Sequence, residues 1–177
     1  LPILIEVVDS LQASFALSIL VIICAETANR GASLSEVAHV AREIGPQIET
    51  YFSVDSLEYL HRGGRIGKAQ VFLGTLMKIK PLLKVMNGEV QPIEKIRTSE
   101  RLLNRFVELV ELAAQEHSQL LMAVGESDNA EVMTDLLGRL ERIPGISLMF
   151  RGKLGGVITS HAGPGALGIA YVKNVLK

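Results

Sequence analysis

The sequence predicts an α/β fold with a mixed, largely antiparallel sheet, and three observations carry that prediction. Apolar runs rich in branched residues alternate with amphipathic segments, as expected when strands alternate with helices. Asn87-Gly88 lies between two such runs and is the strongest short signal for a hairpin, which must be antiparallel. Hydrophobic residues make up 48% of the 177 and charged residues 21%, which indicates a globular chain rather than a disordered one.

The apolar periodicity places each expected element along the chain. Strands are predicted at 1–8, 48–54, 81–86, 89–96, 119–124 and 146–150, the first of them buried. Helices are predicted at 12–30, 33–44, 68–78, 99–113 and 129–142, with a short helical turn near 57–60. Ser33 and Glu36 have the spacing of a capping box, and Thr98 or Ser99 suits the start of the long helix.

Composition and charge exclude several classes of function. The formal net charge is −1 and aromatic residues make up 5%, so the basic surface and stacking platforms of a nucleic-acid binder are both missing. The single cysteine, Cys24, allows neither a disulfide framework nor a thiolate cluster, which favours a reducing, cytoplasmic compartment. Residues 11–25 carry no charge, but about 15 residues fall short of the roughly 20 that span a bilayer. We therefore expect a buried helix there and no membrane span.

Motifs for metal, nucleotide and acyl-enzyme chemistry are also missing. The four histidines have no ligand spacing, so no metal is predicted. The chain contains no GxxxxGK[ST], no GxSxG and no GxGxxG opening a helix. The expectation is a protein that is not an enzyme and holds no cofactor.

The first candidate site is the segment from 57 to 68, LEYLHRGGRIGK. Arg62, Arg65 and Lys68 stand beside the glycine pair Gly63-Gly64, which lets the backbone turn sharply. Free backbone amides together with arginine suit a carboxylate or a phosphate. A solvated surface turn is the simpler alternative and stays open at this point.

The second candidate site is the segment from 160 to 168, SHAGPGALG. It places His161 in a shaped loop with Gly163, Pro164 and Gly165. An imidazole can donate to an oxyanion or accept from a donor near neutral pH, and glycines permit close approach of a ligand to the backbone. A capped loop histidine without a ligand is the alternative.

Three motifs together resemble the DegV family. They are LEYLHRGGRIGKAQVFLGTLMKIKPLLKVMNGEVQPIEKIR at 57–97, HAGPGALGIAY at 161–171 and VVDS at 7–10, in the family's order and spacing. The resemblance implies a two-domain clamp whose second domain has a mixed six-stranded sheet. On that template residues 1–50 are the tail of the first α/β domain, and residues 51–177 are the whole second, lipid-binding domain.

The resemblance also implies a function. Members of the family bind a long-chain fatty acid in an apolar tunnel and present it to a fatty acid kinase for phosphorylation. By motif position His161 would contact the carboxylate, and Arg65 would support the charge through His161 or through water. The residues expected at the lipid headgroup are Arg65, His161, Gly163 and Gly165.

Further expectations concern the tunnel and the partner. The apolar residues expected to line the tunnel are Phe72, Leu73, Leu76 and Met77. Lys95 and Arg97 lie outside any core pattern and are candidates for docking the kinase, with a solvated strand end as the alternative.

The family's headgroup serines and threonines belong to the first domain and would precede Leu1. The 177 residues alone are therefore expected to bind fatty acid weakly or not at all. The unpartnered apolar strand at 1–8 would then pair with a second copy, as a homodimer, or fold back on the second domain.

Two alternative functions remain, an enzyme and an interaction module. The resemblance extends to dihydroxyacetone kinases, so His161 could serve as a nucleophile or base in a phosphotransferase acting on a small ketone. A module that binds no ligand and acts through its surface is the other rival, and it predicts dimerisation that is indifferent to lipid.

Overall fold

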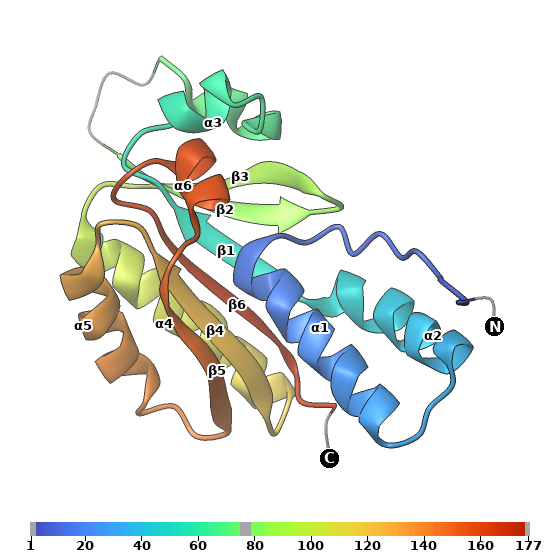
Figure 1. Cartoon of the computed structure of the whole chain (residues 1–177). Helices are drawn as coiled ribbons and strands as arrows, with labels where there is room; N and C mark the ends of the chain where they lie inside the picture. Colours follow the sequence, from blue (N-terminus) through green and yellow to red (C-terminus); the bar gives the residue numbers. More distant parts are fainter. Residues whose placement is uncertain (1–2, 75–78, 176–177) are drawn as a thin grey trace.

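A six-stranded sheet with helices on both faces organises the chain in the computed structural model, which describes residues 3–74 and 79–175 (Figure 1). The strands are β1 (Glu49–Ser53), β2 (Lys80–Met86), β3 (Glu89–Ile96), β4 (Leu120–Glu126), β5 (Ile146–Lys153) and β6 (Leu167–Lys173). Their order is β3-β2-β1-β6-β4-β5, and only the β4–β5 pair is parallel among them. The predicted mixed, largely antiparallel sheet is thus confirmed.

The helices begin largely where the sequence signals them. They are α1 (Ser14–Asn29), α2 (Leu34–Ile44), α3 (Glu58–Arg62), α4 (Ser99–Glu116), α5 (Ala130–Leu140) and α6 (Gly156–Ala162), with two 3₁₀ helices, η1 (Gly45–Gln47) and η2 (Gly67–Phe72). The capping box at the start of α2 is present, because Ser33 Oγ accepts from the Glu36 amide and the Glu36 carboxylate accepts from the Ser33 amide. Thr98 caps α4 by accepting from the amide of Arg101.

The hairpin predicted from Asn87-Gly88 joins β2 to β3. Asn87 and Gly88 both have positive φ, 51° and 76°, as a two-residue turn matched to the twist of the strands requires. Met86 and Glu89 form the last pair of the ladder.

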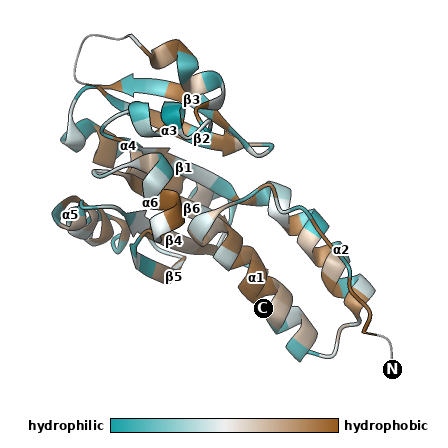
Figure 2. Ribbon diagram, turned by 45° about the horizontal axis from the view of Figure 1, so that its top comes forward, coloured by the Kyte–Doolittle hydropathy of each residue, from teal (hydrophilic) through white to brown (hydrophobic). Residues whose placement is uncertain are grey.

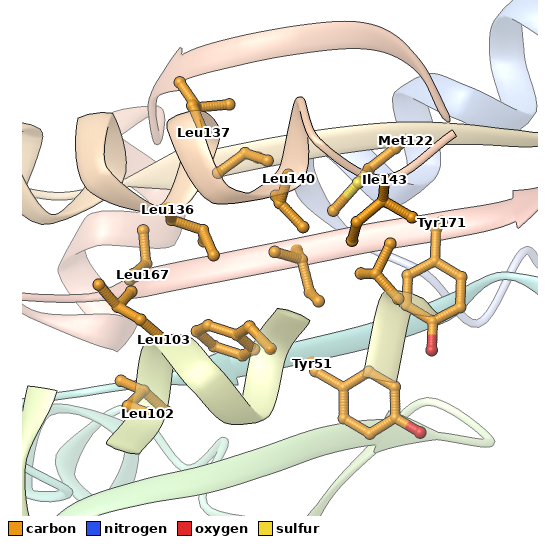
Figure 3. Packing of buried hydrophobic residues seen from close by; sticks show 14 of the residues in the cluster. Tyr51, Leu102, Leu103, Met122, Leu136, Leu137, Leu140, Ile143, Leu167 and Tyr171 are labelled. Atoms are coloured by element: carbon orange, nitrogen blue, oxygen red, sulfur yellow. The ribbon is translucent and has the colours of Figure 1, made fainter. Parts of the chain in front are cut away.

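The face of the sheet under α4 and α5 is filled by large side chains (Figure 3). Phe106 and Leu136 come from the two helices, and Met122 and Tyr171 come from the strands. All four are buried. The opposite face is covered in part by α1, whose Ile19, Leu20 and Ile23 pack on Leu121 and Val172.

The predicted buried strand at 1–8 is wrong over the residues the structure describes. Residues 3–10 form no strand, and Ile3, Leu4, Ile5 and Val7 are 78–87% exposed. The segment runs beside α2 in both ribbon views, and Glu6 pairs with Arg42 of α2 at 2.5 Å (Figures 1 and 2). Strand structure needs a partner strand for its backbone groups, and none lies beside this segment in the described parts of the chain. The assignment of residues 1–50 to a separate domain stays a prediction.

Three further features differ from the prediction. The helix expected at 68–78 is the 3₁₀ helix η2, which ends at Phe72, and residues 75–78 lie outside the described residues. His161, expected in a loop, lies in the last turn of the short helix α6. No element was predicted at β6, although this strand joins β1 to β4 near the centre of the sheet.

Candidate functional site

The sheet face that carries α1 is hollow beyond the start of that helix. A cavity of about 340 Å³ lies there, with walls from the start of α1, from α6 and from the β2–β3 hairpin. Two cross-strand rows form its floor: one is Thr50, Ala170 and Ala123, and the other is Phe52, Gly168 and Gly125.

The alternation of side chains along β4 and β6 explains why this space is empty. Successive residues of a strand point to opposite faces. In β4, Met122 and Val124 belong to the filled face, whereas Ala123 and Gly125 lie between and after them and line the cavity. In β6, Gly168 and Ala170 are likewise small and line the cavity. Small residues on one face and large residues on the other leave room on one side only.

The lining of the cavity is almost entirely apolar. Phe15 of α1 and Leu154, Val157 and Ile158 around the start of α6 contribute to its walls. Among the lining residues in the part of the chain described here, Arg65 carries the only formal charge. A site of this kind favours a hydrocarbon ligand with one polar end.

His161 lies on the wall of this cavity at the end of α6. Its imidazole packs against Gly63, where an added Cβ would come within 2.1 Å of Nδ1. Nδ1 is buried and has no hydrogen-bond partner among the described residues. The glycine at position 63 therefore leaves the space that the imidazole occupies.

Arg65 follows α3, which lies at the same end of the sheet as α6 (Figure 1). One guanidinium nitrogen of this exposed side chain donates to the carbonyl of Gly63 at 2.8 Å. The backbone amide of Arg65 donates to the carbonyl of Leu60, also at 2.8 Å. No carboxylate pairs with Arg65 within the described ranges. Gly63 therefore contacts both site candidates, Arg65 and His161. Because no described carboxylate pairs with Arg65, its guanidinium group is available to an anionic ligand.

Gly163 and Gly165 shape the turn after α6 rather than the cavity wall. Both have positive φ, 75° and 79°, a conformation that favours glycine. An added Cβ at Gly163 would meet the ring of Tyr59 at 2.4 Å, and one at Gly165 would meet the carboxyl group of Asp55 at 2.3 Å. Neither glycine lines the cavity, and their part in headgroup binding stays a prediction.

The described residues among those predicted for the tunnel and for docking do not line this cavity. Phe72 is buried in a small cluster with Leu60 and Ala162, and Leu73 is exposed; neither lines the cavity. Leu76 and Met77 lie outside the described residues. Lys95 of β3 stands over the Phe72 ring, 5.0 Å from its centroid, and Arg97 is exposed just after β3.

Several cavity residues were not singled out from the sequence: Phe15, Ala123, Gly125, Leu154 and Ala170. The alternation of large and small residues in 120–125 and 167–172 was the available signal. This alternation indicates that small residues share one face of the sheet only when residues 167–172 are also recognised as a strand.

A second crevice, of about 420 Å³, lies at the far end of α4 and differs in character. Lys84 of β2 forms a close ion pair with Glu49 and stands 5.0 Å from the centroid of the Tyr51 ring. Burial raises the pKa of Tyr171 and of Tyr51. Burial alone would lower the pKa of Lys84, but the combined interactions of its ammonium group with Glu49 and Tyr51 outweigh burial and raise it. Lys84 is already paired within this crevice, so the apolar cavity is the better candidate for a ligand site.

Among the described residues, membrane-spanning helices and metal-binding clusters are both absent. No helix there has both the length and the apolar character needed to cross a membrane. No group of three or more His, Cys, Asp or Glu side chains there could hold a metal ion.

A family model described as "Uncharacterised protein, DegV family" matches residues 2–174. This chain belongs to the DegV family. A DegV domain-containing protein of Streptomyces coelicolor, SCO2569, is 35% identical over 173 residues, which cover 95% of this chain and 60% of the relative.

Two solved DegV structures have the same fold. The structure titled as fatty acid binding of a DegV family protein from Thermus thermophilus matches with a TM-score of 0.89 and 29% identity, over 96% of this chain and 61% of the other. DegV from Bacillus subtilis, titled a fatty acid binding protein, matches with a TM-score of 0.81 and 31% identity, over 94% and 60%. The chain spans about 60% of the length of these DegV relatives.

Proposed function

We propose that this chain binds a long-chain fatty acid, with the hydrocarbon in the cavity on the α1 face and the carboxylate at His161 and Arg65. One observation carries the proposal: a cavity whose floor is built of small and apolar residues has one cation and one imidazole together on its wall. A fatty acid has the same two parts, an apolar chain and a single anionic end.

The energetics of the two parts differ. Each methylene group removed from water contributes about 0.8 kcal/mol, so the chain supplies most of the affinity. A carboxylate gains nothing from an apolar site and must be met by donors or a cation. Arg65, which no carboxylate of the described residues neutralises, and His161 supply a cation and a donor at one point. The Thermus thermophilus and Bacillus subtilis DegV proteins, both described as fatty acid binding, support the choice of ligand.

We propose a binding protein rather than an enzyme. The ligand would be presented to a fatty acid kinase in the cytoplasm, with Lys95 and Arg97 as candidates for the docking surface and a homodimer as a further assembly. These finer statements rest on the family resemblance. A small ketone or polyol is disfavoured as the ligand, because a hydroxyl buried without a partner is costly and the cavity is lined by apolar side chains.

The test is displacement of cis-parinaric acid, a fluorescent fatty acid, by palmitate, with the Bacillus subtilis DegV protein as the positive control. The chain is expected to bind palmitate, more weakly than the longer relative. His161→Ala is expected to reduce the affinity about tenfold, the effect of losing a charge-assisted hydrogen bond. His39→Ala, on the exposed surface of α2, is the matched control and should leave the affinity unchanged.

Mass spectrometry of the purified protein gives an independent readout. A long-chain fatty acid extracted in stoichiometric amount would support the proposal. An absence of both extracted lipid and palmitate binding, while the control protein binds, would overturn it for this chain.

A further inference from the structure

The helix that carries His161 is held at its start by the end of β4. The amide of Leu154, two residues before α6, donates to the carbonyl of Glu126 at 2.7 Å. The hydroxyl of Thr159 in turn donates to the carbonyl of Leu154 at 3.2 Å. These bonds tie the entry into α6 to the last residue of β4.

The exit from α6 is tied to the same segment of chain. The amide of Gly165 donates to the carbonyl of Ser127 at 2.6 Å, and the amide of Ser127 donates to the carbonyl of Ala166 at 2.9 Å. The side-chain amide of Asn129 donates to the carbonyl of Gly165 at 2.9 Å. The turn after His161 is therefore bound on both sides by residues 127–129.

A buried carboxylate fixes the corner from which Asn129 acts. Glu126 is only 1% exposed, and its Oε2 accepts from the backbone amide of Asn129 at 2.7 Å. Asn129 occupies the N-cap position of α5, yet its side chain makes no capping bond to that helix. A residue type suited to capping is used here to hold a distant turn.

We propose that Asn129 is a positioning residue for His161. Its side-chain amide holds the turn at Gly165 in place, and this turn fixes the end of α6 so that the imidazole stays on the cavity wall. Asn129 does not line the cavity and acts through His161 alone. The inference rests on the proposed function, because it assigns the imidazole to the carboxylate.

The test compares two ligands that differ only at the headgroup, palmitate and hexadecanol, by displacement of cis-parinaric acid. The affinity for hexadecanol reports on the cavity alone. The affinity for palmitate divided by the affinity for hexadecanol reports on the carboxylate contact. Asn129→Ala and Asn129→Asp both remove the donor to Gly165. Each is expected to lower the ratio about fivefold with the hexadecanol affinity unchanged, as the loss of one ordered hydrogen-bonding contact implies.

Thr134→Val is the matched control, since it removes a local bond of similar length, from Thr134 to the carbonyl of Ala130, on the exposed side of the same helix. It should leave the ratio unchanged. An unchanged ratio in both Asn129 variants would overturn the positioning role. A wild-type chain that binds both ligands equally would instead overturn the proposed headgroup site, and the inference with it.

A measurement without ligand tests the positioning role of Asn129 separately from the proposed headgroup site. In NMR spectra the imidazole Cε1–H resonance of His161 is expected to shift or broaden in Asn129→Asp, while that of His39 stays in place. A His161 resonance identical to wild type would show that Asn129 does not position the ring.

Discussion

The two faces of the sheet are built from alternate residues of the same strands, yet one face is filled and the other is hollow. Under α4 and α5, side chains such as Met122 and Phe106 are fully buried. On the face of α1, Ala123 and Ala170 leave a cavity that reaches His161. Close packing on the filled face stabilises the fold, whereas the unfilled space on the other face can accommodate a ligand. The comparison predicts that substitutions of neighbouring residues will separate stability from binding.

The largest expected effect falls on the filled face. Met122→Ala should lower the free energy of unfolding by about 2–5 kcal/mol, because it removes buried methylene groups and leaves a void. Urea denaturation followed by circular dichroism measures it. Palmitate affinity of the folded fraction should change little. A loss of affinity as large as the loss of stability would mean that the two faces are not independent.

Ala123→Phe, one residue further along β4, should instead reduce palmitate affinity, which Met122→Ala leaves almost unchanged. Its ring would enter the cavity, so palmitate affinity should fall at least tenfold, about 1.4 kcal/mol. Overpacking costs about 1–3 kcal/mol of stability, a lower range than the one expected for Met122→Ala. The same displacement assay measures affinity. Undiminished binding would show that the ligand lies elsewhere.

Gly63→Ala probes the edge of the hollow face. The residue has φ −76°, which alanine accepts without strain, but its Cβ would come within 2.1 Å of His161 Nδ1. The imidazole must move, so palmitate affinity should fall about fivefold with little change in melting temperature. Gly138→Ala is the control: nothing lies within 4 Å of its Cβ in α5, and it should stabilise by about 0.5–1 kcal/mol without affecting binding.

The smallest effect concerns the exterior of the filled face. Arg139 of α5 pairs with Asp135 and with Glu100 of α4, and these hydrogen bonds lower the pKa of both carboxyl groups below their ordinary values of 3.8 and 4.5. A lowered pKa in the folded state stabilises above the ordinary value and loses its effect as the pH falls through the lowered one. The melting temperatures of wild type and Arg139→Met should therefore differ most near pH 7 and converge below about pH 4. An equal difference at both pH values would exclude the ion pairs as its cause.

Features that depend on near neighbours along the chain could be predicted from the sequence alone. The capping box of Ser33 and Glu36 and the turn at Asn87-Gly88 form as predicted, because their hydrogen bonds and φ angles involve only a few adjacent residues. The long helix α4 follows from its three- and four-residue apolar spacing. The motifs around Arg65 and His161 indicated the two residues that the structure brings to one cavity.

Features that need partners distant in sequence become evident only in the folded chain. The apolar run at 3–8 is no strand, because the described sheet offers it no partner. Strand β6 lies between β1 and β4, and that placement sets Gly168 and Ala170 beside Ala123 and Gly125 to form the cavity floor. The packing of Gly63 against His161 joins two motifs far apart in the sequence. Local patterns determine helices and turns, whereas the site depends on long-range packing that no short window of sequence contains.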